Sequence, residues 1–181
     1  MKGSNDQQAQ EIKELIARNF LHPDMNNEFT GNKFFGDSDL TIHRTPHWMA
    51  SVRMASDRVI GTELVNEDNL KGYYMADGAI YTYIRGDEYH NIFPFWDWRR
   101  IPGITTYESD APIPTESGAD SRNQTNLVGG TTDGKQGIKA LPLNRKGLSA
   151  NKVWISTDEF ILTMGSHPHN DGTATTNPSN P

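Results

Sequence analysis

The sequence predicts an all-β protein, an antiparallel β-sandwich preceded by one short helix. Three observations lead to this prediction. From Leu40 onward apolar and polar residues alternate with a period of two, which is typical of strands. Turn signals such as Asp77-Gly78 divide this region into short runs. Helical spacing of apolar residues is confined to the first 20 residues, so the rest of the 181-residue chain has to bury its core between sheets.

The helix is predicted between Asp6 and Phe20. Asp6 can act as the N-cap, and the helical pattern stops at His22-Pro23 because proline cannot continue a helix. The apolar stripe of this helix needs a surface to lie on, either a sheet or a neighbouring domain. The stripe consists of Ala9, Ile12, Leu15, Ile16 and Phe20.

Five central strands are predicted, at residues 47–56, 58–65, 71–76, 79–85 and 92–98. The first has one apolar face and one mixed face. Asp77-Gly78 lies between the third and fourth strands and predicts a two-residue hairpin. Pro94 has no N–H to donate, so it places the fifth strand at a sheet edge or a bulge.

The second half of the chain begins with a polar insertion at residues 108–126, which is too long for a tight connection and is predicted to run over the surface. Further β segments are predicted at residues 127–143, 152–157 and 160–164. The residues after Ser166 are polar and of low complexity, so disorder is predicted there. The predicted organisation is a helix and linker at 1–33, a sandwich domain at 34–166 and a polar tail at 167–181.

Composition excludes several classes of function. The net charge of −6 and the lack of a Lys/Arg run argue against a nucleic-acid partner. No run approaches eighteen apolar residues, so no membrane span is expected. The chain has no cysteine, so it can form neither a disulfide nor a thiolate metal site. Its first ten residues are polar, and we expect no signal peptide in this chain.

Four aromatic residues come directly before two arginines: Phe93, Phe95, Trp96, Trp98, then Arg99 and Arg100. The aromatic rings could stack on the apolar faces of sugar rings, or they could form the core of the sandwich. The paired arginines could hold a uronate or sulfate through their N–H donors. Alternatively, they form surface ion pairs with some of the 23 acidic residues.

No metal or cofactor site is predicted. His43 and His47 have the spacing of a metal pair on a helix, but Pro46 and the β period exclude that helix. His167 and His169 lie in the predicted tail. The chain has no G-x-S-x-G pattern, so a hydrolase triad has no support either.

A polar cluster lies between two of the predicted strands, in the sequence TELVNEDN. Its carboxylates and amides can face a groove, and Glu63 and Asn66 can point into one site only near a strand end or bulge. The alternative is a loop that uses Asn and Asp to form turns. The cluster consists of Glu63, Asn66, Glu67, Asp68 and Asn69.

Four segments, in order, resemble the central β-domain of polysaccharide lyase family 8, which includes hyaluronate, chondroitin and xanthan lyases. They begin FFGDSDLTIHRTPHW, TELVNEDNLKGYY, IFPFWDWRRIPG and NLVGGTTDGKQG, and the resemblance extends from Phe34 to Ser166. It implies an α/α toroid followed by an antiparallel sandwich of the galactose-mutarotase-like supersandwich type. This chain corresponds to part of that sandwich.

The resemblance also implies an activity, the cleavage of uronic-acid-containing polysaccharides by β-elimination. In the family the catalytic Asn, His, Tyr and Arg come from the toroid, and the β-domain contributes a glutamate three residues before an asparagine. By resemblance Glu63 supports the catalytic group, and Asn66 contacts the saccharide. Family members imply an extracellular or periplasmic, bacterial location.

Two functions are therefore expected. The first is the β-domain of a lyase that is inactive by itself because the toroid is missing, so whether this chain is an enzyme in its own right stays open. The second is a non-catalytic carbohydrate-binding or assembly module that uses Trp96, Trp98 and Arg99-Arg100. The expected partners are an acidic polysaccharide, a helical toroid domain, or a second copy paired through exposed sheet edges.

Overall fold

The computed structural model describes residues 3–17, 29–64, 67–116 and 118–172. Within them, eight strands form two antiparallel sheets of four. The first sheet contains β1 Gly31–Phe35, β2 Leu40–Arg44, β3 Met49–Arg53 and β4 Ala79–Tyr83. The second contains β5 Gly129–Thr132, β6 Gly137–Arg145, β7 Leu148–Ser156 and β8 Ile161–Asn170. In both sheets every strand pairs with its neighbour in sequence, and the predicted all-β sandwich is confirmed.

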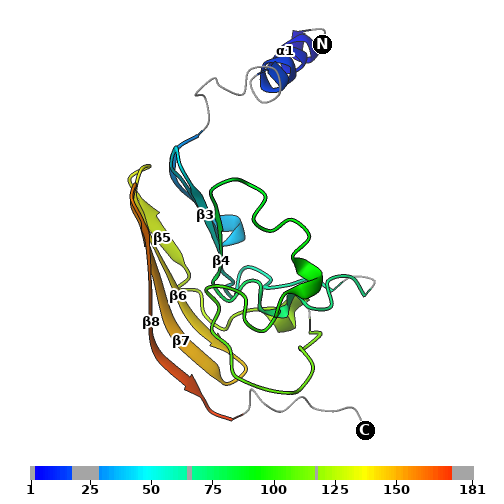
Figure 1. Ribbon diagram of the computed structural model, residues 1–181, viewed down its shortest axis with the longest axis vertical. Coiled ribbons are helices and arrows are strands. Elements are labelled where there is room, and N and C mark those ends of the chain that lie inside the picture. Colours follow the sequence, from blue (N-terminus) through cyan, green and yellow to red (C-terminus); the bar gives the residue numbers. More distant parts are fainter. Residues whose placement is uncertain (1–2, 18–28, 65–66, 117, 173–181) are drawn as a thin grey trace.

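The two sheets face each other across a common core (Figure 1). Alternate residues of β3 and of β6 and β7 are buried, as the period of two requires. Trp154 of β7 lies at the centre of this core with no exposed surface. The other buried core residues are Val52, Met54, Val128, Leu141, Leu143, Leu148 and Ala150.

The N-terminal helix α1, Gly3–Ile16, begins three residues earlier than predicted. Asp6 therefore lies in its first turn and is not the N-cap. The apolar stripe is solvent-exposed, with Ile12 56%, Leu15 49% and Ile16 46% exposed. The end of the predicted helix, at 18–20, lies outside the described residues.

Three of the predicted strands are wrong, each for a local reason. At 58–64 the chain turns instead, because the Ser56 hydroxyl accepts the N–H groups of Arg58 and Val59. At 71–76 a 3₁₀ helix forms over Gly72–Tyr74, so Asp77-Gly78 does not close a two-residue hairpin. At 92–98 a 3₁₀ helix covers Phe93–Phe95, and Pro94 fits its first turn.

The C-terminal hairpin is confirmed. β7 and β8 pair around residues 157–160, where the Thr157 N–H bonds to the Phe160 carbonyl oxygen at 2.9 Å. β8 continues to Asn170, whereas disorder was predicted from residue 167, and residues 173–181 lie outside the described part of the chain. β8 is an edge strand of its sheet, exposed from Leu162 to Asn170. Self-association through this edge stays a prediction.

The predicted surface excursion at 108–126 is anchored more deeply than expected. Among its described residues a 3₁₀ helix forms over Gly118–Ser121. The buried Asn123 side chain donates to the carbonyls of Ala55 (3.1 Å) and Pro142 (3.0 Å), and so it joins the two sheets. Burial of a polar anchor depends on partners that are distant in sequence, so composition suggested a more exposed segment.

A second polar chain links the sheets at their opposite end. Buried His43 of β2 donates from Nε2 to the Thr157 carbonyl at 2.8 Å and accepts at Nδ1 from Asn32 of β1 at 3.3 Å. The Asn32 side-chain oxygen in turn accepts from Lys139 Nζ of β6 at 3.0 Å. This pattern fits a neutral imidazole, with its proton on Nε2.

Stability is therefore expected to fall as the pH drops below about 6.5. Burial is the main cause that lowers the pKa of His43 below its ordinary 6.5. Below that pH the unfolded chain binds a proton that the folded chain does not, so acid favours unfolding. Urea unfolding at pH 7.5 and pH 5 measures this slope. The variant His43→Gln should reduce this dependence of the unfolding free energy on pH, whereas His47→Gln, at an exposed position, should leave it unchanged. An equal dependence on pH in all three proteins would contradict the role of His43.

Candidate functional site

A groove of about 630 Å³ lies at the end of the first sheet where β3 ends. It is formed by the 3₁₀ turn at Gly36–Ser38, the end of β3 and the segment 58–63. Glu63 is one of its lining residues and is exposed. Five charged residues line the groove: Asp37, Glu63, Arg53, Arg58 and Arg122.

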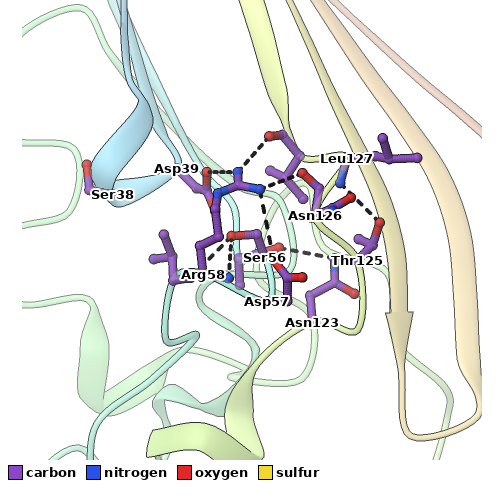
Figure 2. A network of polar contacts seen from close by, with 12 residues as sticks. Ser38, Asp39, Ser56, Asp57, Arg58, Asn123, Thr125, Asn126 and Leu127 are labelled. Atoms are coloured by element: carbon purple, nitrogen blue, oxygen red, sulfur yellow. Dashed lines mark hydrogen bonds and ion pairs between the residues drawn. The ribbon is translucent and has the colours of Figure 1, made fainter.

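Arg58 is fixed in this wall by a buried acid. Figure 2 shows its guanidinium reaching Asp39, whose side chain has no exposed surface, with an Nη2–Oδ1 distance of 3.4 Å. The same Nη2 donates to the carbonyl of Val128 at 3.0 Å. Even so, the Arg58 side chain is 47% exposed. It therefore presents positive charge to the groove from a fixed position.

The other groove arginines are held differently. Arg53 donates to the carbonyls of Ser38 and Ile60, so it ties the two sides of the groove together. Burial lowers the pKa of Arg53, and the charge of Asp39 opposes this shift. Arg122 is exposed. Three guanidiniums and two carboxylates line the groove, and the buried carboxylate of Asp39 beside Arg58 and Arg53 brings the local formal charges into balance.

Glu63 lies on a loop and not at a strand end. The Asn69 side chain donates to the carbonyl of Glu63 at 3.4 Å and to the Thr62 hydroxyl at 3.2 Å, which closes the polar turn. Asn69 has a positive φ of 58°, a conformation that asparagine tolerates well. The described residues of this segment form a loop, and two members of the polar cluster, Glu63 and Asn69, line the groove. Asn66 lies outside the described residues.

The described lining of the groove contains no histidine and no tyrosine. One carboxylate among arginines can attract an anion and hold a neighbouring group, but it provides no matched acid and base. Tyr73 is close in sequence, yet its ring is buried, packs on Arg145 at 4.1 Å and bonds to Glu116 at 3.3 Å. Burial raises the pKa of Tyr73, as expected for a structural tyrosine.

The aromatic residues from Tyr81 to Trp98 form a separate cluster, called here the aromatic cluster. Neighbouring ring centroids are 5.1–5.9 Å apart. Its members are Tyr81, Tyr83, Tyr89, Phe93, Trp96 and Trp98. None belongs to the hydrophobic core, so the core interpretation is wrong. Phe95 is 89% exposed.

The two predicted arginines point to different partners. Arg99 donates to the Tyr74 hydroxyl at 3.0 Å and to the Ala111 carbonyl at 2.7 Å. Arg100 forms exposed ion pairs with Glu108 at 3.0 Å and with Asp97 at 3.7 Å. The ion-pair interpretation therefore holds for Arg100.

None of the predicted saccharide contacts at Trp96, Trp98, Arg99 and Arg100 lines the groove with Glu63. Their role in substrate binding stays a prediction.

Among the described residues no helix is long and apolar enough to cross a bilayer. The same residues contain no group of three acidic or histidine side chains placed to hold a metal.

From the sequence, Arg53 and Arg58 are two of five arginines that could bind an acidic polymer locally, the others being Arg44, Arg99 and Arg100, but nothing brings them together with Glu63. Arg122 comes from a different part of the chain and was missed. The one feature of the sequence that could have indicated the groove arginines is Arg53, a charged residue on the mixed face of a predicted strand. Their convergence depends on the buried acid Asp39 and on the path of segment 118–128, which only tertiary structure specifies.

Comparison with known proteins gives the following matches. A family model for polysaccharide lyase family 8, super-sandwich domain, matches residues 30–177. Chondroitinase-AC of Pedobacter heparinus is 38% identical over 133 residues, which cover 72% of this chain and 19% of that protein. A hyaluronate lyase of Thermasporomyces composti is 32% identical over 143 residues, covering 74% and 18%.

A solved structure agrees with these matches. The structure of a Streptomyces coelicolor A3 chondroitin AC lyase in complex with chondroitin sulphate superposes with a TM-score of 0.69 at 28% identity. The match covers 80% of this chain and 20% of that one. The chain thus spans about a fifth of the length of these relatives.

Proposed function

Because the chain belongs to polysaccharide lyase family 8, we propose that it forms the super-sandwich part of an enzyme that cleaves uronic-acid-containing polysaccharides by β-elimination. The match of the family model over residues 30–177 carries this proposal. Relatives named chondroitinase-AC and hyaluronate lyase support an acidic glycosaminoglycan as the substrate class. The exposed guanidiniums of Arg58 and Arg122 in the groove beside Glu63 are suited to contact the acidic groups of such a polymer.

The reaction defines what this site has to supply. A base removes the C5 proton of the uronate, the C4–O bond breaks, a C4–C5 double bond forms, and the leaving oxygen takes up a proton. We assign Glu63 as a positioning residue that holds the catalytic groups, with Asn66 in contact with the saccharide. The guanidiniums of Arg58 and Arg122 raise the local concentration of the polyanion.

The 181-residue chain by itself is proposed to be inactive. The described groove offers a carboxylate and cations, whereas the elimination also needs a matched base and acid. A helical domain that docks at the Glu63 face would have to supply them. A polysaccharide of this kind is found outside cells, so we propose an extracellular or periplasmic location in a bacterium.

A segment exchange tests this proposal. Residues 30–170 of this chain replace the matching segment of Pedobacter heparinus chondroitinase-AC, and turnover is followed by the ultraviolet absorbance of the unsaturated uronate product. We expect the hybrid to cleave chondroitin and the isolated chain to give no product. Turnover by the isolated chain would contradict its inactivity. A hybrid that folds, shown by a single melting transition, and yet gives no product would refute the lyase assignment.

A second candidate function is a carbohydrate-binding module, favoured by the surface position of the aromatic cluster. Its flat rings suit the apolar faces of sugars. If this holds, Trp96→Ala should weaken saturable binding of chondroitin by the isolated chain, measured by calorimetry. Phe160→Ala, at an exposed aromatic outside the cluster, serves as the control. Equal affinities for both variants and the parent chain would remove this candidate.

A further inference from the structure

We propose that a second pocket, at the far end of the first sheet from Glu63, binds the carboxylate or sulfate group of an acidic sugar. The pocket has a volume of about 340 Å³ and lies where β2 ends at Arg44 and β3 begins at Met49. The strand register pairs Arg44, Met49 and Tyr83 at this end and Leu40, Arg53 and Ala79 at the groove end. The two sites therefore lie at opposite ends of the same strands.

The charge of the pocket matches an anion. Arg44, His47 and Arg85 line it, and its lining contains no aspartate or glutamate. Arg85 lies 3.8 Å from Asp87 in a pair whose side chains are 80% and 68% exposed, so solvent screens that contact. On a protein with a net charge of −6, a pocket lined by two arginines and by no acidic residue is a specific feature, and the carboxylates of Asp87 and Glu88 adjoin it on the loop that carries Arg85.

The β2–β3 wall of the pocket is held by its own hydrogen bonds. The Thr45 hydroxyl accepts the N–H groups of His47 at 3.1 Å and Trp48 at 3.0 Å. The Thr45 N–H bonds to the Trp48 carbonyl at 2.8 Å, which closes the turn. His47 is thus presented on a fixed loop, and a fixed loop loses less conformational entropy on binding.

The wall that carries Arg85 is held by a carboxylate. Glu88 accepts the N–H groups of Ile84 and Arg85 at 2.6 Å each and that of Gly86 at 2.9 Å. These backbone bonds lower the pKa of Glu88 to about 2. Glu88 therefore orders the loop that carries Arg85, and its ionised carboxylate is directed at three backbone N–H groups.

The pocket also has a surface for the sugar ring. Trp48 and Tyr83 line it, and Tyr83 belongs to the aromatic cluster. From Tyr83 the rings pack on to Tyr89 at 5.1 Å and then to Trp96 at 5.8 Å. An acidic group held by the arginines would thus place its sugar ring beside Trp48 and Tyr83, at the edge of the aromatic cluster. A chain of acidic sugars fits this arrangement better than a small inorganic anion does.

The polymer class rests on the proposed function, but the pocket is tested by binding alone. The isolated chain is titrated with chondroitin sulfate, desulfated chondroitin and neutral dextran at low salt, and the NMR signals of the Trp48 indole and His47 are followed. We expect Arg44→Gln/Arg85→Gln to weaken binding of chondroitin sulfate by at least about tenfold, because charge-assisted hydrogen bonds are lost. The control Lys71→Gln/Lys135→Gln removes the same charge from exposed positions outside the pocket.

The polymers separate the two sources of charge. If desulfated chondroitin binds as tightly as chondroitin sulfate, the pocket binds the carboxylate. If desulfated chondroitin does not bind, the pocket binds the sulfate. The proposal would be overturned if Arg44→Gln/Arg85→Gln bound chondroitin sulfate as tightly as the parent chain. It would also be overturned if dextran bound as tightly as chondroitin sulfate, or if no polymer bound. If the double variant does not fold, the affinity of Arg85→Gln alone is measured. That side chain is 80% exposed, so its replacement should leave the fold intact. Turnover of the segment-exchange hybrid is measured separately, so failure of one proposal leaves the other intact.

Discussion

Replacing Arg145 by methionine is expected to lower the free energy of unfolding by about 3–5 kcal/mol, because it leaves a buried carboxylate unpaired. Arg145 is 5% exposed, and its guanidinium donates to the Asp77 carboxylate, itself 1% exposed. It also donates to the Ser121 carbonyl at 3.2 Å and packs on the Tyr73 ring at 4.1 Å. This one residue of β6 therefore contacts two segments, the turn that carries Tyr73 and Asp77 and the long connection at Ser121.

The effect should depend on pH. Burial raises the pKa of Asp77 to about 6 against the opposing charges of Arg145 and Lys152. Without Arg145 that carboxyl holds its proton more tightly still, so the folded variant binds more protons than the unfolded chain. Its stability then falls as the pH rises above the ordinary pKa of an aspartate. The loss relative to the parent chain should be smaller at pH 5 than at pH 8.

Urea unfolding followed by circular dichroism measures both effects. Arg100→Met is the matched control, because its ion pair with Glu108 is exposed to solvent, which screens it, and should contribute little to stability. Adding Asp77→Asn to Arg145→Met should restore part of the loss, since it removes the unpaired charge. A loss below 1 kcal/mol for Arg145→Met would show that the buried pair is not what joins these segments.

Replacing Glu63 by glutamine in the segment-exchange hybrid is expected to lower kcat about 100-fold. A positioning carboxylate acts by holding reacting groups, and a misplacement of 1 Å can cost that much. The exposed carboxylate does not contribute to the core, so the melting temperature should not change. A role in holding a base would also shift the pH–rate profile, which a purely structural role would not do.

The control for this variant is Glu67→Gln, an exposed acid on the same polar turn. It should change neither kcat nor KM appreciably. If Glu63→Gln raised KM with kcat intact, Glu63 would act in ground-state binding and not in positioning. Equal kcat values for the two variants would remove Glu63 from the reaction.

The strands that the sequence predicted correctly are those whose alternation is uninterrupted. β3 and β7 are predicted as strands because their buried and exposed residues follow the pleat. The errors at 58–64 and 92–98 have a different cause. There, one side chain or a proline sets the local backbone, as the Ser56 hydroxyl and Pro94 do. Apolar content alone does not reveal such turn chemistry.

By itself, then, the sequence determined the all-β class and the family, because these depend on periodicity and on motifs that are contiguous along the chain; the role of Glu63 stays a prediction. Only the tertiary structure decided which cations accompany Glu63, that the aromatic cluster lies on the surface, and that Arg99 and Arg100 have separate partners. The physical reason is that a charged or aromatic side chain acquires its role from the groups it meets. For Arg58 those groups are Asp39 and Val128, and no local pattern joins positions so far apart.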